Sequence, residues 1–387
     1  MDFSDIQHFR RVIAGVVLRA VVGRTDARVA SGSLLPRSGI HRVLICRFVH
    51  TLGDALHLTP LIQEIQAIYP GAEIDVISAS PVAREIYSYF FQVRHLYTFP
   101  AHVVRHPLRT LRTLKSMRRV EYDLVIDNCT ESQSGRLLTI LANAKYKLGF
   151  SGPKKRGNVT CAVAIPQSPT HKAQLPVYLL RHALGVETER EADYPQLSVA
   201  LTADERRRGA KLLARVIAGQ NGGYRNKRVL GIFANATGAK AFPIDWWNAF
   251  LPALERQYAD HVMVELLSAS AESVLGHRYP TYFSSDVREL GSVIAGLSMF
   301  VSPDCGVLHL ACAVGANTIG LFSVTKIAQW GPYGSANRAI DTIGKTPQQV
   351  ACEIGGGLSS LHVRRSDGKA SSDLESFDAE YKTACSP

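Results

Sequence analysis

The chain has 387 residues, 46% of them hydrophobic, and a formal net charge of +11. The apolar content is that of an ordinary globular protein, and the length exceeds the usual size of one hydrophobic core, so two domains are expected. The positive charge predicts an acidic partner: nucleic acid, anionic lipid or a phosphorylated substrate. The seven cysteines show no CxxC spacing, which argues against a zinc site or a disulfide framework and predicts a reducing compartment.

Residues 6–22 have the pattern of a basic amphipathic helix, with Arg11 and Arg19 opposite an apolar face. The apolar run is too short to span a bilayer, and Arg19 also breaks the apolar centre that a signal peptide needs. We expect a helix that lies on an anionic membrane surface; the alternative is an extra helix packed on the adjoining domain. Residues 1–40 are therefore predicted to form an N-terminal extension.

Strand and helix patterns alternate from residue 42 onward. This alternation predicts an α/β fold in which parallel sheets carry helices on both faces. In the first half, at 41–186, strands are expected at 42–48, 74–78, 93–99, 123–127 and 145–150, and helices at 54–69, 81–91, 106–119, 132–142 and 176–184. Residues 151–170 lack clear helical periodicity.

The alternation restarts after a polar stretch at 187–198, which suits an interdomain connection. In the second half, at 187–345, helices are expected at 203–218, 244–258 and 287–297, and strands at 228–233, 261–267, 299–301 and 318–322. Residues 346–387 are rich in Gly, Ser and Asp, and we expect a short helix followed by a flexible tail.

The first motif that carries chemistry is GDALHLTP at 53–60, where a strand gives way to a helix. Gly53 permits close backbone approach, and Asp54 sits at the start of the helix. Asp54 is therefore either a helix N-cap or a catalytic carboxylate. The loop lacks GxGxxG, so it is not a dinucleotide fingerprint.

The second motif is the loop at 231–243, which contains Gly238 and Lys240 and precedes a helix. Backbone amides and a single ammonium suit a diphosphate, although a lone lysine can equally be a solvated surface residue. The loop is not a Walker A sequence.

The third motif spans 299–334 and reads as a strand, a turn, a helix and a second strand, followed by the turn WGPYG at 330–334. Ligands of open α/β sheets bind at the carboxyl ends of strands, and a helix that begins there offers N–H groups to an anion. Asp304 can accept hydrogen bonds from sugar hydroxyls. His309 is either a ligand contact or a structural hydrogen-bonding residue.

A basic helix is expected at 106–119, because Arg105, Arg109 and Arg112 recur at near-helical spacing. Residues 154–156 add a second basic cluster. No aromatic residues are interleaved as in a nucleic-acid platform. An acceptor that carries phosphates, or a membrane that carries anionic lipid, fits these clusters better.

Taken together, the motifs resemble those of glycosyltransferase family 9, the ADP-heptose:lipopolysaccharide heptosyltransferases. The family patterns are G-D-x-x-L-x-T-P, K-x-W-P, D-T-G-x-x-H-L-A and W-G-P-x-G. They are matched, in this order, at 53–60, 240–243, 304–311 and 330–334. Three positions depart from the patterns: His57 replaces Leu, Phe242 replaces Trp and Cys305 replaces Thr.

The resemblance implies a GT-B architecture, with two Rossmann-like domains facing a central cleft, and an inverting mechanism without an obligatory metal or cofactor. It implies that Asp54 is the general base, that Lys240 holds the donor diphosphate and that Asp304 contacts the donor sugar. The other expected donor-side residues are Cys305, Gly306, His309, Thr325 and Glu272. The expected acceptor-side residues are Arg47, His57, Arg105, Arg109 and Arg112.

The predicted function is transfer of a sugar, heptose from ADP-heptose in the first instance, to a lipopolysaccharide-core or related glycolipid. We expect a cytoplasmic enzyme at the inner face of the cytoplasmic membrane that does not bind nucleic acid. One alternative is a family member that uses another nucleotide sugar for capsule, O-antigen or protein glycosylation. Another is a non-catalytic glycan-binding member. Two altered donor loops favour it, ANA at 234–236 where the family commonly has H-P-G and SVT at 323–325 where it commonly has G-P-T; Asp54 and Lys240 argue against it.

The N-terminal extension gives the first testable prediction. Deletion of residues 1–35 should release the protein from anionic vesicles, because the basic amphipathic helix is removed. Vesicle co-sedimentation measures this, and undiminished binding would refute the membrane helix.

Overall fold

The computed structural model describes residues 34–100, 106–152, 155, 157–168, 170–186, 194–218 and 228–355. The predicted membrane helix and the predicted C-terminal tail lie outside these residues. The chain divides into two compact units, Met1–Phe242 with Asp260–Ile343, and Pro243–Ala259 with Gly344–Pro387. The domain boundaries expected from the sequence stay a prediction.

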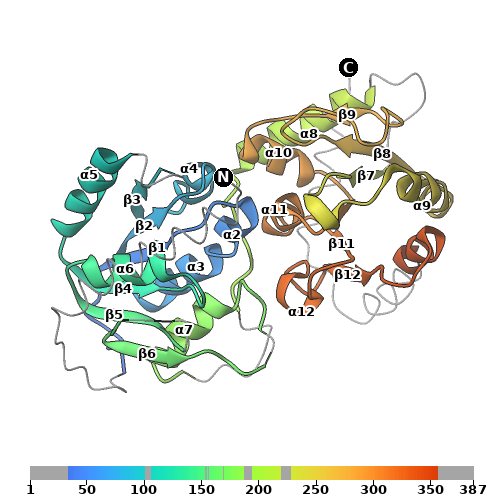
Figure 1. Ribbon diagram of the computed structural model, residues 1–387. Helices are drawn as coiled ribbons and strands as arrows, with labels where there is room; N and C mark the ends of the chain where they lie inside the picture. The colour runs from blue at the N-terminus through green and yellow to red at the C-terminus, as the bar shows by residue number, and fades with distance from the viewer. Residues whose placement is uncertain are drawn as a thin grey trace, which may run out of the picture. The chain divides into compact units, whose positions relative to one another are not determined.

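The first unit contains two six-stranded sheets, and every strand pair in both is parallel (Figure 1). The first sheet has the order β3-β2-β1-β4-β5-β6. Its strands are β1 (Arg42–Arg47), β2 (Glu73–Ser78), β3 (Val93–Thr98), β4 (Tyr122–Asp127), β5 (Ala144–Ser151) and β6 (Cys161–Ala164). β6 lies in the segment for which the sequence showed no clear pattern, because its four residues are too few to establish a period.

Helices cover both faces of the first sheet, as the alternation predicted. Val43 and Ile45 of β1 belong to the cluster built with α3 and α7, whereas Leu44 and Cys46 point the other way, toward α5 and α6. The period of two along a strand produces this division. The helices are α2 (Leu52–Leu56), α3 (Thr59–Ile68), α4 (Ala83–Tyr87), α5 (Pro107–Arg118), α6 (Gln133–Leu141) and α7 (Leu175–Ala183).

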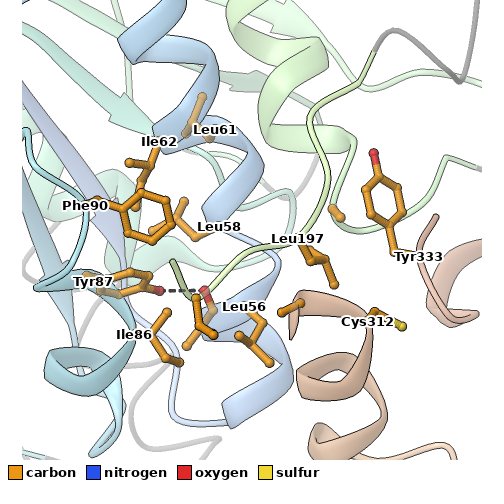
Figure 2. Packing of buried hydrophobic residues seen from close by; sticks show 14 of the residues in the cluster. Leu56, Leu58, Leu61, Ile62, Ile86, Tyr87, Phe90, Leu197, Cys312 and Tyr333 are labelled. Atoms are coloured by element: carbon orange, nitrogen blue, oxygen red, sulfur yellow. Dashed lines mark hydrogen bonds between the residues drawn. The ribbon is translucent and has the colours of Figure 1, made fainter. Parts of the chain in front are cut away.

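The single helix predicted at 54–69 is wrong, because the chain forms α2 and α3 with a break between them. Pro60 has no N–H to give to the carbonyl of Leu56. The Thr59 hydroxyl donates to that carbonyl instead, at 2.8 Å. Figure 2 shows the Tyr87 hydroxyl, which donates to the carbonyl of Ala55 at 2.8 Å just before the break. The break lets α2 end at Leu56, two residues after Asp54.

The second sheet has the order β12-β11-β10-β7-β8-β9. Its strands are β7 (Arg228–Ile232), β8 (His261–Leu266), β9 (Thr281–Tyr282), β10 (Met299–Pro303), β11 (Thr318–Phe322) and β12 (Arg338–Asp341). The associated helices are α8 (Ala203–Ala218), η3 (Gly238–Lys240, a 3-10 turn), α10 (Val287–Ile294), α11 (Gly306–Val314) and α12 (Ile327–Trp330). The central strands β10 and β11 are buried throughout, as expected of a parallel sheet covered on both faces.

The second unit consists of α9 (Ile244–Gln257) and a helix at 347–355. The Tyr258 hydroxyl donates to the carbonyl of Ile354 at 3.5 Å and joins the two helices. Trp246 stacks on Phe250 with ring centroids 4.8 Å apart, so the aromatic residues of α9 pack within this unit.

Two predictions about surface segments need correction. Leu35 and Ile40 are each 3% exposed, so the predicted N-terminal extension includes core residues, and the deletion proposed above should stop at residue 33. Lys155 was expected in a basic surface cluster, but its side chain is 1% exposed and its ammonium lies 2.8 Å from Asp127. Lys154 and Arg156 lie outside the described residues. Among the described helices, none is long and apolar enough to cross a membrane.

Candidate active site

Asp54 lies in the first turn of α2, at the carboxyl end of β1. The N-cap of α2 is Thr51, whose hydroxyl accepts from the Asp54 N–H at 3.1 Å. The same hydroxyl donates to Asp54 Oδ2 at 2.8 Å. The carboxylate is therefore not the helix cap, which was one of the two expectations, and its side chain keeps 28% of its surface exposed.

Arg47, the last residue of β1, holds the other oxygen of this carboxylate. Its Nη2 lies 3.2 Å from Asp54 Oδ1 and 3.4 Å from the Asp54 carbonyl. Its Nη1 lies 3.9 Å from Cys129 Sγ, and the residue as a whole is 7% exposed. The structure thus directs Arg47 at Asp54 rather than outward toward an acceptor, because the guanidinium is buried against the carboxylate.

A second carboxylate, Asp304, follows β10 and is 4% exposed. Lys240 Nζ lies 2.7 Å from its Oδ2, and the Thr325 hydroxyl donates to the same oxygen at 2.5 Å. Within the described residues Oδ1 accepts no hydrogen bond. The lysine, the aspartate and the threonine predicted on the donor side are therefore in direct contact.

The starts of α2 and α11 touch through two glycines. A Cβ on Gly53 would lie 3.0 Å from the His309 ring, and a Cβ on Gly306 would lie 3.0 Å from Leu52 Cβ. A side chain at either position would lie closer than ordinary van der Waals contact, so His309 or Leu52 would have to shift. This contact brings the Asp54 segment against the segment that follows Asp304.

Cys305 is the N-cap of α11 but makes no capping hydrogen bond. Its thiol lies 3.3 Å from the Ser302 hydroxyl, and burial raises its pKa. A threonine at this position could cap the helix with its hydroxyl. A thiol is only a weak acceptor, so Cys305 leaves the first N–H groups of α11 better able to bind an anion than a threonine cap would.

His57 and His309 form a buried pair. His57 Nε2 lies 3.4 Å from His309 Nδ1, and the rings are 0% and 3% exposed. Burial lowers the pKa of His309 to about 4 and places the pKa of His57 well below its usual value, so both rings are neutral at pH 7. Each ring then carries one proton, and the bond between them needs one donor and one acceptor.

The surroundings of His57 Nδ1 decide which ring donates. This atom is buried and has no hydrogen-bond partner among the residues that the structure describes. A buried N–H without a partner is rarer than a buried acceptor without one, so the proton of His57 belongs on Nε2, where it points at His309 Nδ1. His309 must then carry its own proton on Nε2. The charges of Asp304, Lys240 and Asp54 all act on this ring.

The structure does not bring every predicted site residue to this place. Glu272 is exposed in the loop that follows β8, and Arg109 and Arg112 are exposed on α5. In the described part of the chain, none of these three side chains bonds to Asp54 or Asp304. Arg105 lies outside the described residues. His57 is fully buried, so its ring faces His309 and not a surface on which an acceptor could bind.

Within the described part of the chain, no group of three His, Cys, Asp or Glu side chains could hold a metal.

Sequence reasoning missed His171 as a member of the site. Its Nε2 donates to the Gly331 carbonyl at 2.9 Å, and its Nδ1 accepts from the Ala173 N–H at 3.1 Å. Its ring lies 5.6 Å from that of His57 and 4.8 Å from that of Tyr333, measured between centroids. A single histidine before a helix gives no local signal of such a position.

A cavity of about 310 Å³ opens at the carboxyl ends of β4, β5 and β6. Hydroxyl and charged groups line it, among them those of Thr130, Glu131, Thr170 and Lys172. Thr130 directly follows Cys129, which contacts Arg47. The cavity is thus linked to Asp54 through Thr130, Cys129 and Arg47. It lies at the carboxyl ends of the strands, where ligands of parallel sheets bind.

Comparison with known proteins agrees with this architecture. The model of glycosyltransferase family 9 (heptosyltransferase) matches residues 110–355, a range that contains Lys240 and Asp304 but not Asp54. No curated protein matches the sequence.

Three solved structures share the fold. A family 9 glycosyltransferase from Veillonella parvula is 14% identical at a TM-score of 0.66, covering 85% of this chain and 91% of its own. Escherichia coli heptosyltransferase WaaC with ADP is 19% identical, with a TM-score of 0.62; the match covers 82% of this chain and 99% of WaaC. E. coli ADP-heptose lipopolysaccharide heptosyltransferase II is 18% identical, with a TM-score of 0.59; the match covers 84% of this chain and 100% of the E. coli chain. The predicted GT-B fold is confirmed.

The buried histidines predict that stability depends on pH. His171 and His309 have folded-state pKa values of about 4, below the value of about 6.5 in an unfolded chain. Their contribution is complete above pH 6.5 and is lost as the pH falls toward 4, by up to about 1.4 kcal/mol per pH unit for each residue.

Chemical denaturation of wild type and of His309→Asn between pH 7 and 4 measures this effect. The slope of the free energy of unfolding against pH should be shallower for this variant than for wild type, because about one proton fewer is taken up on unfolding. The His106→Asn variant, changed at an exposed position, should follow wild type. Equal slopes for wild type and His309→Asn would show that the ring is not buried in its neutral form.

Proposed function

The chain belongs to glycosyltransferase family 9, and from this premise we propose that it is an inverting enzyme that transfers a sugar from a nucleotide-sugar donor to an acceptor hydroxyl. The observation that carries the proposal is the contact between the starts of α2 and α11. It places a carboxylate that is not a helix cap beside a lysine, an aspartate and uncapped helix N–H groups.

Asp54 is the proposed general base. As the acceptor oxygen attacks the anomeric carbon, its proton passes to the Asp54 carboxylate, and the bond from that carbon to the donor phosphate breaks. Arg47 and Thr51 each bond one carboxylate oxygen. These bonds fix the orientation of the base.

The donor diphosphate is proposed to bind between Lys240 and the N-terminus of α11. Negative charge grows on the diphosphate as it leaves, and the ammonium and the helix N–H groups can stabilise that charge. Asp304 Oδ1, which is not used by Lys240 or Thr325, can accept a hydroxyl of the transferred sugar.

His309 is proposed to donate a hydrogen bond from Nε2 toward the same leaving group. His57 is a positioning residue in this scheme, because it fixes the tautomer of His309 through the bond between their rings. A neutral imidazole donates to an anion without changing its own charge.

We propose that the donor is ADP-heptose, because E. coli WaaC was solved with ADP and the second E. coli relative is described as an ADP-heptose enzyme. A different nucleotide sugar is favoured by one feature, the cysteine at the α11 N-cap. This cysteine offers no hydroxyl to a phosphate.

The acceptor is proposed to be a glycolipid of the lipopolysaccharide-core type, held at the cytoplasmic face of the membrane. The cavity beside Thr130 suits its sugar, since hydroxyl and charged side chains line it. Lys172 in the wall can pair with a carboxylate or phosphate on that sugar.

Asp54→Ala should lower the rate of transfer about 10²- to 10⁴-fold, because the general base is removed. Donor affinity should change little, since Asp54 does not contact the donor in this scheme. Asp204→Ala, which removes an exposed carboxylate from α8, is the matched control. Turnover of Asp54→Ala equal to that of wild type would rule out its assignment as the base.

Lys240→Ala should weaken binding of the donor nucleotide about 10- to 100-fold, because a charge-assisted contact to phosphate is lost. Calorimetric titration of wild type, of Lys240→Ala and of Lys211→Ala, which removes an exposed lysine from α8, measures the effect. If all three proteins bind the nucleotide equally, Lys240 lies outside the donor site.

A further inference from the structure

The helix α5 has two different faces. Thr110, Thr113, Leu114 and Met117 recur at helical spacing and turn toward the protein, where Met117 is fully buried and Leu114 packs against the core. The opposite face contains Leu108, Leu111, Arg112 and Lys115. These residues have the same i, i+3, i+4, i+7 spacing, offset by two residues from the inward set. Every residue of this second face is exposed.

Among the described residues, none covers the two leucines on the outward face. Leu108 is 70% exposed and Leu111 is 61% exposed. Single exposed leucines need no explanation, but two on one turn form a small apolar strip. The inward face is already satisfied by the core, so the strip cannot be explained as part of the packing of α5 on the sheet.

Cations surround this strip. Arg109, Arg112, Lys115, Arg118 and Arg119 are all exposed, and residues 107–119 contain no acidic residue. In the part of the chain that the structure describes, none of the five lies within 4 Å of a carboxylate. Solubility alone would explain the charges but not the leucines between them.

We propose that the outward face of α5 docks on the surface of an anionic lipid bilayer. The leucines would enter the boundary between headgroups and acyl chains, and the guanidinium and ammonium groups would contact lipid phosphates. Nucleic acid would use the cations but has no place for the leucines, and the helix carries no aromatic residue for base stacking. An acidic protein would likewise leave the apolar strip in water unless it supplied a matching one.

The position of α5 in the fold permits this contact. α5 packs on β3, which is an edge strand of the first sheet, so no further strand lies beyond it. Figure 1 shows α5 at the end of that sheet, in blue-green. The inference rests on this face alone and not on the transferase activity, so the two can fail independently.

The experiment measures co-sedimentation of the full chain with vesicles of phosphatidylcholine, with and without phosphatidylglycerol. Arg112→Gln/Lys115→Gln should lower the partition coefficient on anionic vesicles about tenfold or more. Leu108→Ser/Leu111→Ser should also lower it about tenfold, because the apolar strip is lost. Neither variant should alter donor binding, since α5 does not contact the donor-side residues.

Two controls separate this proposal from general effects of charge and apolarity. Arg208→Gln/Lys211→Gln on α8 lowers the net charge by the same amount as the α5 charge variant, and Ile343→Ser removes an apolar side chain that is 69% exposed. Both should bind vesicles as wild type does. The proposal is overturned if the α8 variant loses as much binding as the α5 charge variant. It is also overturned if the leucine variant binds unchanged, which would indicate a soluble polyanion or an acidic protein instead of a bilayer.

Discussion

The contact between two helix starts, with a glycine on each side, is the constraint on which the proposed site depends. At Gly53 a side chain would meet the His309 ring, and at Gly306 it would meet Leu52. Backbone can approach this closely only where both residues lack a Cβ. The break after α2, enforced by Pro60, keeps that helix short and lets Thr51 and Asp54 turn their side chains toward each other. The chemistry proposed for the chain needs both helices in this arrangement.

Both carboxylates of the site are paired, but the two pairs have different consequences. Arg47 is almost fully buried against Asp54, and a buried charge that loses its partner is strongly destabilising. This pair is therefore expected to hold the carboxylate in place until Asp54 takes up the acceptor proton and becomes neutral. The Lys240 side chain is 34% exposed, whereas that of Asp304 is 5% exposed, so Asp304 would be left as a buried charge if Lys240 moved away. Lys240 is therefore expected to contact a diphosphate while it stays paired with Asp304.

The fold could be predicted largely from the sequence, because buried parallel strands such as β1, with the unbroken apolar run VLIC at 43–46, are separated by helical patterns. The break at Pro60 was available in principle, since proline cannot donate the missing hydrogen bond. The site could be predicted only in part. His57 and His309 are 252 residues apart, and no local pattern encodes their pairing. The burial of Arg47 and Lys155 was equally inaccessible, because it depends on carboxylates brought close by the fold.

The central claim is that the chain binds a nucleotide-sugar donor at the joined starts of α2 and α11. The most direct test is a thermal-shift titration of the full chain with ADP, UDP, GDP and CDP and with their sugar conjugates. A ligand that binds only the folded state at 100 times its dissociation constant stabilises that state by about 2.7 kcal/mol. We predict that ADP or ADP-heptose raises the unfolding temperature in a dose-dependent way and that Gly306→Val abolishes the shift. If none of these nucleotides changes the unfolding temperature of wild type, the claim is contradicted.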